Sequence, residues 1–304
     1  MSAVMVESAA AGMRMAPTGR ARRRRRSTRS LIARIITNLA LVSYCLSTVS
    51  AFVWCVMTSL KSNPEFFSSS PWSTPHTAHV GNYSQAWSDA RIGSYFVNSL
   101  YVTAVSVTAS VGLSLMAAYA LTRVPFRGRG FVRMVFLSGL IMPGFLVIVP
   151  LYSVLRDLHL LGSLNGLIIV YVASQMPFNV FVLSSFFGSL PKELEEAAYV
   201  DGCPPARTFF SIVVPQAGPA IASVGLLNIL TIWNEFFFAL VFLNNENSQT
   251  IPVGILGLSV NAEYSGQWVQ LFAGLVISMV PMLVVFAVAQ DRITKGLSAG
   301  GLKG

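Results

Sequence analysis

The chain has 304 residues, of which 54% are hydrophobic and only 11% charged, whereas about 25% of residues are charged in an average soluble protein. This composition argues against a pair of soluble domains and predicts that lipid is the solvent for most of the chain. In a soluble protein the net charge of +9 would raise the question of nucleic-acid binding, and the distribution of the basic residues decides between this and a role at the membrane.

Most of the excess charge lies in residues 1–30, which we expect to form a basic, disordered cytoplasmic tail. Its run Arg22 to Arg26 lacks interleaved aromatic residues and precedes an apolar segment. The run is therefore expected to set the orientation of the chain in the membrane and to attract anionic lipids, rather than to bind RNA. The apolar segment Ile35 to Leu60 has no charge and is too long for a signal-peptide core of about 7 to 15 residues. Despite the cleavage-like Val49-Ser50-Ala51, residues 31–94 are predicted to hold an uncleaved first transmembrane helix and an outer loop.

Apolar runs of about 18 residues or more predict transmembrane helices. The predicted fold is an all-α membrane protein with six such helices. They are Ile35 to Leu60, Tyr95 to Leu121, Met134 to Leu155, Leu164 to Phe187, Ala220 to Leu243 and Trp268 to Ala289. Prolines inside the third, fourth and sixth runs predict kinks, which membrane helices tolerate where neighbours satisfy the freed backbone groups.

The positions of Lys and Arg predict the orientation of these helices, because cytoplasmic loops retain positive charge. With the amino terminus inside, 18 of the 21 basic residues lie on the cytoplasmic side, and only Lys61, Arg91 and Arg156 lie outside. Both termini and the loop 188–215 are therefore predicted to be cytoplasmic.

The three cysteines and three histidines do not predict a disulfide or a metal site. Cys45 and Cys55 lie about 15 Å apart along one predicted helix, and Cys203 lies in a cytoplasmic loop. His76, His79 and His159 lie in outer loops without further ligands that would complete a coordination shell. We expect no metal and no cofactor in this chain.

The loop 188–215 is a polar island between apolar segments, and its sequence predicts two short helices joined at a glycine. Ser189 is placed to cap the first helix, Gly202 to end it, and Pro204 to begin the second. Ala197 and Ala198 predict a surface of small residues that another protein could approach closely. The alternative is a solvated connecting loop.

The complete spacing of this island resembles the membrane subunits of binding-protein-dependent ABC importers. Their motif reads E-A-A, three residues, G, nine residues, I, one residue, L, P, and here it is Glu196-Ala197-Ala198, Gly202, Ile212, Val214 and Pro215. Val214 replaces the leucine. The resemblance runs from about residue 98 to the end and implies the type I ABC importer transmembrane fold over residues 95–290. It also implies that Glu196, Ala197, Ala198, Gly202, Ile212 and Pro215 contact a separate ATPase.

The carboxy-terminal segment 291–304 is predicted to be a cytoplasmic tail. Its sequence from Gly296 to Gly304 resembles the G-L-[ST]-A-G-G-[VL]-K-G ending of the subfamily that imports di- and oligosaccharides. By this resemblance Gly300, Gly301 and Lys303 reach the ATPase dimer interface. A flexible glycine-rich end is the alternative.

The chain has no phosphate-binding loop of the form G-x-x-x-x-G-K-[ST], so ATP hydrolysis by that mechanism is expected in a partner subunit, which would bind ATP and Mg²⁺. The resemblance further implies a second permease subunit, an extracytoplasmic sugar-binding protein and a location in a prokaryotic plasma membrane. Residues 244–267 form a predicted outer loop that contains prolines and glycines. This loop is a weaker candidate for contact with the binding protein.

Polar residues in the apolar runs are candidates for the substrate pathway. Asn228, Thr231 and Glu235 are spaced to line one face of the fifth predicted helix, and Asn234 lies beside them. Asn179 is a further candidate on the fourth helix. Amide and carboxylate groups suit sugar hydroxyls, and Trp233 could offer a stacking face. Structural hydrogen bonding between helices is the alternative role.

Two other functions remain open from the sequence. A secondary carrier for a small polar solute would need ion-coupling residues, and apart from Glu235 the predicted helices hold almost no charge. A membrane scaffold would use the cytoplasmic loop only to recruit a soluble partner. The favoured prediction is a permease subunit of an ATP-driven sugar importer, which is a transport component and not an enzyme.

Overall fold

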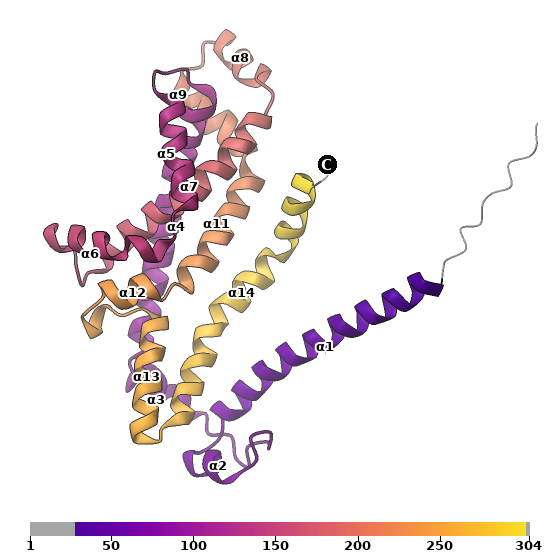
Figure 1. Ribbon diagram of the computed structural model, residues 1–304, viewed down its shortest axis with the longest axis vertical. Coiled ribbons are helices and arrows are strands. Elements are labelled where there is room, and N and C mark those ends of the chain that lie inside the picture. Colours follow the sequence, from indigo (N-terminus) through magenta and orange to yellow (C-terminus); the bar gives the residue numbers. More distant parts are fainter. Residues whose placement is uncertain (1–27, 302–304) are drawn as a thin grey trace, which may run out of the picture. The chain divides into compact units, whose positions relative to one another are not determined.

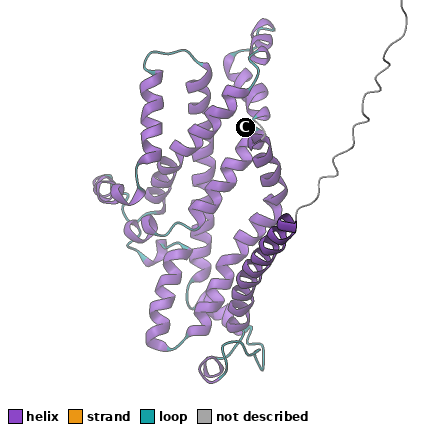
Figure 2. Cartoon of the chain, turned by 45° about the vertical axis from the view of Figure 1, so that its right-hand side comes forward, coloured by secondary structure: helices purple, strands orange, loops and turns teal. Residues whose placement is uncertain are grey.

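A computed structural model describes residues 28–301, with side chains described for residues 33–289. Within this part of the chain every regular element is a helix (Figures 1 and 2). Four helices are long and apolar enough to cross a membrane, and two sharply bent helix pairs bring the number to six if each pair counts as one span. The all-helical prediction is confirmed, whereas the exact number of six spans remains a prediction. The predicted tail 1–30 lies almost entirely outside the described residues.

Helix α1 (Thr28–Ser59) contains the first candidate span and runs without a break through Val49-Ser50-Ala51. The residues up to Ala51 form one unit, and the chain from Phe52 onward forms the other. In the first unit, apolar side chains such as Leu39 and Tyr44 are exposed, which suits a helix surrounded by hydrocarbon. In the second unit, the Trp54 ring packs edge-on against Phe272 of α14.

The segment after α1 folds around a buried cation. Lys61 is 2% exposed, and its ammonium donates to Ser69 Oγ, Ser70 O and Ser73 Oγ at 3.1 to 3.2 Å. Two short helices, α2 (Asn63–Ser68) and α3 (Gly81–Ser88), lie in this segment. The His76 backbone N–H donates to Glu65 at 2.9 Å and holds the pKa of that carboxyl below its usual range.

Helices α4 (Ile92–Arg123) and α7 (Leu164–Ser189) form the centre of the second unit and pack along each other. Ser106, Ser110 and Ser114 are fully buried at four-residue intervals along α4. Small side chains at this spacing allow close approach of neighbouring membrane helices. Two apolar clusters hold the helices together, one centred on Tyr171 and Phe242 and one on Leu183 and Phe187.

The third predicted span is broken. Helix α5 (Arg129–Ile141) is followed by the 3-10 turn η1 (Gly144–Val147) and by α6 (Ile148–Asp157), and the two parts meet at 105°. Pro143 is extended at the break, where its ring removes a backbone donor. Proline and glycine here therefore turn the chain far more than the kink expected from the sequence.

The second bent pair lies at the start of the fifth predicted span, where Pro205–Gln216 meets Gly218–Trp233 at 75°. This predicted span is also interrupted further along the chain. Helix α11 (Gly218–Trp233) ends ten residues before the predicted end at Leu243, and a separate short helix, α12 (Phe237–Phe242), follows. Residues 244–267, expected from the sequence to form an outer loop, contain η3 (Glu246–Ser248) and α13 (Ile251–Ser265). Helix α14 (Trp268–Gly301) continues twelve residues past the predicted end at Ala289.

Candidate functional site

The polar island folds as the sequence predicts, into two short helices joined at a glycine. They are α8 (Glu193–Val200) and α9 (Pro205–Thr208). Gly202 has φ +74°, a left-handed conformation that residues with a Cβ adopt only at a cost. The Gly202 and Cys203 N–H groups donate to the carbonyls of Tyr199 and Ala198, at 3.0 and 2.8 Å, and so complete the end of α8.

The start of α8 differs from the sequence prediction. Ser189 does not cap this helix, because its hydroxyl donates back to the Phe186 carbonyl at 2.7 Å, within α7. The residue at the cap position is Lys192, whose side chain makes no capping bond. The extended Leu190 separates α7 from α8, so Ser189 is too far back in the chain to reach the first free N–H groups.

A buried ion pair fastens α8 to the transmembrane helices. Arg123, the last residue of α4, places its Nε 3.0 Å from Glu195 Oε1, and the two side chains are 6% and 11% exposed. The same guanidinium donates to the carbonyls of Phe187 and Leu190 at 2.7 Å each, where the carboxy-terminal end of α7 leaves free acceptors. One arginine thus connects the ends of α4 and α7 with the first turn of α8.

Tyr119 provides a second connection, from one turn earlier on α4. Its hydroxyl donates to Glu195 Oε2 at 3.0 Å, and its ring lies 4.8 Å from that of Phe209. Phe209 begins η2 (Phe209–Val213), a π-helical turn that continues α9 into α10 (Val214–Gln216). Because Phe209 and Val213 belong to the buried cluster around Phe187, the second half of the island is anchored in the core against which Tyr119 also packs.

The motif residues differ in their exposure to solvent. Glu196, Ala197, Gly202 and Pro215 are exposed and Ile212 is half-buried, but Ala198 is only 5% exposed. The expectation that Ala197 and Ala198 present one small-residue surface is therefore wrong, since adjacent helix positions point about 100° apart. Large apolar side chains are exposed in the same segment. They are Leu194, Tyr199, Val200 and Phe210.

The candidate pathway residues do not share one face. Asn228 is fully buried and donates to Ser110 Oγ at 3.1 Å, while its Oδ1 has no partner in the described structure. Asn179 is also fully buried, and neither of its amide atoms has a partner among the described residues. Thr231 is exposed, and its hydroxyl bonds back to the Leu227 carbonyl. Of these three, only Thr231 is open to a solute in this conformation.

Glu235 lies beyond the end of α11 and stabilises the break between α11 and α12. Its Oε2 accepts from the Tyr171 hydroxyl at 2.6 Å, and its carboxylate also accepts from the N–H groups of Phe238 and Ala239 at 2.9 and 3.2 Å. A carboxylate at a helix amino terminus satisfies the free donors of the first turn. The geometry therefore matches the structural role for Glu235, and the predicted alignment with Asn228 is wrong because the helix ends at Trp233.

Trp233 is not available as a stacking face. It is 4% exposed, packs edge-on against Phe96, and donates its indole N–H to the Ser278 carbonyl at 3.3 Å. Beside it lies a cavity of about 470 Å³ between α11, α13 and α14, and exposed Asn234 is one of its few polar lining residues. Its mostly apolar lining suits a helix side chain or lipid better than a sugar.

The predicted ATPase-contacting tail is described only in part. Gly300 and Gly301 lie in the last turn of α14, and Lys303 lies outside the described residues. The backbone of residues 291–301 is helical, so the glycine-rich sequence does not prevent α14 from continuing.

Sequence reasoning missed Arg123, Tyr119 and Glu195. A signal was present, because Arg123 follows an apolar run and Glu195 directly precedes the motif glutamate. An ionic group at the end of a membrane helix requires a partner or water. The sequence alone gives no spacing rule that would pair two residues 72 positions apart.

Comparison with known proteins gives one consistent result. Residues 110–299 match the family described as binding-protein-dependent transport system inner membrane component. The probable ABC transporter permease protein YurM of Bacillus subtilis is 38% identical over 86% of each chain. The diacetylchitobiose uptake system permease protein NgcG of Streptomyces coelicolor is 37% identical over 87% of each chain. A chain in the crystal structure of a bacterial ABC transporter that imports the acidic polysaccharide alginate superposes with a TM-score of 0.76 at 25% identity, over 88% of this chain and 97% of that one.

Proposed function

Because this chain belongs to the family of binding-protein-dependent transport system inner membrane components, we propose that it forms part of the pathway through which an ATP-driven importer moves a di- or oligosaccharide. The family consists of permease subunits, which are transport components and not enzymes, and ATP is hydrolysed by a separate subunit. The proposal of a sugar is supported by the diacetylchitobiose permease and by the alginate importer, which the chain resembles over most of its length.

The partners follow from this assignment as part of the proposal. A second permease subunit would complete the pathway, a cytoplasmic ATPase dimer would bind ATP and Mg²⁺, and a sugar-binding protein would deliver the cargo from outside. The distribution of Lys and Arg supports a topology with both termini and the α8–α9 segment in the cytoplasm of a bacterial cell. The outer segment with α13 would then face the binding protein.

We assign the contact with the ATPase to Glu196, Ala197, Ala198, Gly202, Ile212 and Pro215, with Gly300, Gly301 and Lys303 as a second contact. Exposed Leu194, Val200 and Phe210 support the idea that another protein covers this segment, since large apolar side chains gather at interfaces. Ala198 would support the contact indirectly, because its small buried side chain lets α8 pack close to the core.

The observation that carries the coupling proposal is the buried Arg123–Glu195 ion pair. A displacement of α8 by the ATPase cannot be absorbed by a loose loop, because Arg123 also holds the end of α7 and Tyr119 holds Phe209. The movement therefore passes to α4 and α7 as a rigid-body rotation. Nucleotide and sugar then shift the inward and outward populations by their differential affinity for the two states.

The test is reconstitution of the four kinds of subunit in lipid vesicles. The sugar-loaded binding protein is expected to stimulate ATP hydrolysis and to drive uptake that continues after the ion gradients are collapsed. Uptake that needs an ion gradient but no ATP would instead identify a secondary carrier. The topology is tested in intact cells that carry the chain with its native cysteines removed. There, Ala197→Cys should react with a membrane-impermeant maleimide only after the membrane is permeabilised. Reaction from outside intact cells would contradict the topology.

A further inference from the structure

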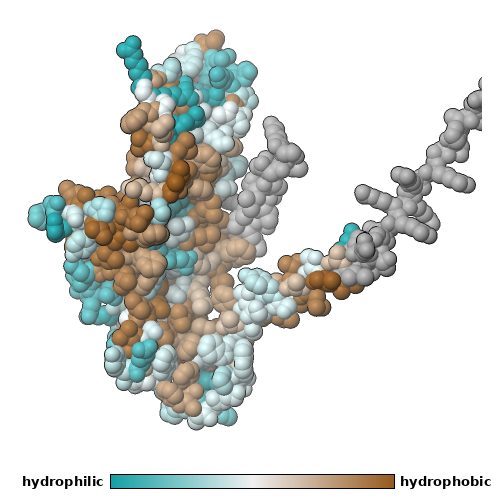
Figure 3. Space-filling view, in the orientation of Figure 1, coloured by the Kyte–Doolittle hydropathy of each residue, from teal (hydrophilic) through white to brown (hydrophobic). Residues whose placement is uncertain are grey.

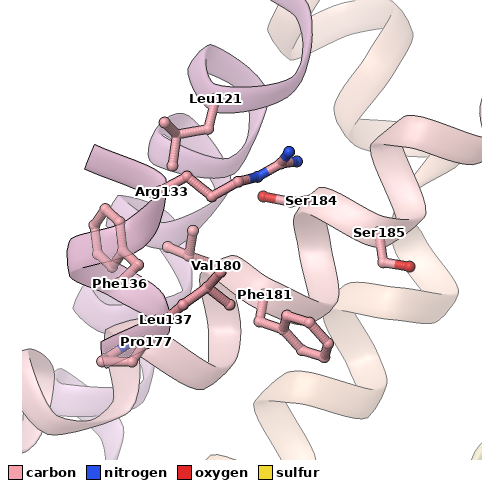
Figure 4. A pocket seen from close by; sticks show the side chains of 9 residues that line it. All are labelled: Leu121, Arg133, Phe136, Leu137, Pro177, Val180, Phe181, Ser184 and Ser185. Atoms are coloured by element: carbon pink, nitrogen blue, oxygen red, sulfur yellow. The ribbon is translucent and has the colours of Figure 1, made fainter. Parts of the chain in front are cut away.

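A cavity of about 290 Å³ lies between α5 and α7, beside the cytoplasmic end of α4 in the proposed topology. Six of its nine lining residues are apolar, and they include Phe136 and Leu137 from α5 and Phe181 from α7 (Figure 4). The floor is closed where Gly139 meets Pro177, since a Cβ at Gly139 would lie 2.7 Å from the proline ring. The cavity is therefore a small apolar slot with one polar end.

Two unpartnered hydrogen-bond donors meet at that polar end. Ser184 is 8% exposed, and its hydroxyl has no hydrogen-bond partner in the described part of the chain. Arg133 is exposed, and it makes no ion pair and no side-chain hydrogen bond with any described residue. In Figure 4 its guanidinium extends from α5 across the cavity toward the Ser184 hydroxyl. A guanidinium beside a free hydroxyl is suited to bind an anionic oxygen, and phosphate above all.

The depth of these groups matches the level of lipid headgroups in the proposed topology. Arg133 lies four residues after the start of α5, and Ser184 lies five residues before the end of α7. At 1.5 Å per residue both are about 6 to 8 Å inside their helix ends. Pro177 lies two helical turns deeper than Ser184, so the apolar part of the cavity extends toward the centre of the bilayer.

The exposed face of α5 is apolar, as expected of a helix surface in contact with lipid. None of the residues of α5 is buried, and Phe131, Met134 and Ile141 are 71%, 67% and 83% exposed. Hydrophobic residues also gather on the surface where α5 passes into α6 (Figure 3). Cytoplasmic leaflets carry anionic lipids, which basic residues at this level attract.

We propose that this cavity binds one anionic phospholipid of the cytoplasmic leaflet, with its phosphate at Arg133 and Ser184 and an acyl chain between Phe136, Leu137 and Phe181. The inference rests on the proposed topology. The lipid would fill a gap between α5 and α7, the helices adjoining the α8 anchor, and so would couple the lipid composition of the membrane to the packing of these helices.

The test uses the complete importer, purified with its partner subunits from nanodiscs that contain phosphatidylglycerol or only phosphatidylcholine. Native mass spectrometry then counts the lipids retained. Arg133→Gln should weaken retention of one phosphatidylglycerol about fivefold, the effect expected of one basic residue at the membrane surface. Arg127→Gln is the matched control, because Arg127 is exposed in the same basic stretch but does not line the cavity. Equal losses in the two variants, or equal retention of phosphatidylcholine, would overturn the proposal.

A second measurement avoids removal of the arginine. Benzoylphenylalanine in place of Phe136 should, on irradiation, form an adduct with the mass of phosphatidylglycerol, and Leu137→Trp should abolish that lipid's retention by filling the cavity. Crosslinking of position 136 to the partner permease or to the transported sugar would overturn the lipid assignment. Sugar-stimulated ATP hydrolysis, measured on the same wild-type preparation, tests the importer function separately from lipid retention.

Discussion

Arg123 Nε lies 3.0 Å from Glu195 Oε1, in an ion pair that joins the end of α4 to the first turn of α8 and is almost closed to solvent. Glu195 directly precedes the exposed Glu196, so neighbouring glutamates have opposite surroundings. The inner glutamate holds the helix in place, and the outer glutamate is left free to contact another protein.

Removal of one member of this pair should be severe. Arg123→Gln or Glu195→Gln is expected to destabilise the chain by about 3–5 kcal/mol, because the remaining charge is left buried without its partner. Thermal denaturation of the detergent-purified importer measures this loss, and sugar uptake should fall with it. Glu193→Gln is the control, since Glu193 is exposed on the same turn.

The double variant Arg123→Met with Glu195→Leu separates the contribution of the ion pair from that of the other contacts of Arg123. Replacing a buried ion pair by apolar side chains often restores stability. We therefore expect thermal stability near that of the wild type. Thermal stability as low as in the single variants would show that the contacts of Arg123 with Phe187 and Leu190, rather than the ion pair, dominate.

Reversal of the exposed charge should act on function without affecting insertion. Glu196→Lys is expected to reduce sugar uptake at least tenfold at an unchanged amount of chain in the membrane, because it alters the surface assigned to the ATPase and no contact in the core. Uptake and membrane abundance are measured side by side. Asp157→Lys is the matched control, because Asp157 is an exposed acid at the end of α6, outside the segments assigned to the ATPase or the binding protein. Normal uptake by the Glu196 variant would remove this residue from the coupling contact.

The turn at Gly202 should tolerate no Cβ without cost. Gly202→Ala is expected to strain the turn by about 1–2 kcal/mol, because φ is +74° although no atom blocks the added methyl group. Gly202→Asn should be milder, since asparagine adopts left-handed φ more readily. Co-purification of the ATPase with each variant measures the effect. Gly218→Ala, where φ is not positive and the space is open, should bind the ATPase normally. Equal binding by all three variants would exclude a role for the turn geometry.

Glu235 and Tyr171 should affect stability rather than sugar affinity. Tyr171→Phe removes a 2.6 Å hydrogen bond to a carboxylate and should cost about 1.5–3 kcal/mol of stability. Thermal denaturation and the sugar concentration dependence of uptake are measured on the same preparation. An unchanged KM with a lowered melting temperature supports the structural role. A changed KM with an unchanged melting temperature would instead indicate that Glu235 contributes to the substrate pathway.

The sequence by itself determined the membrane class, the positions of the apolar segments and the two-helix form of the coupling segment. Each of these depends on local properties, because hydropathy over a run of residues and the conformational freedom of Gly202 act within one stretch of chain. The motif spacing from Glu196 to Pro215 identified the family for the same reason.

Only the tertiary structure decided where the polar side chains point. It brought Arg123 to Glu195, turned Ala198 inward, placed Glu235 on Tyr171 and left Asn179 without contact to solvent. The Glu235 contact depends on the helix break after Trp233, and the Arg123 contact depends on a pairing between residues distant in sequence. Because a buried polar group must take whatever partner the neighbouring helix provides, its role is fixed by packing and not by its spacing along the chain.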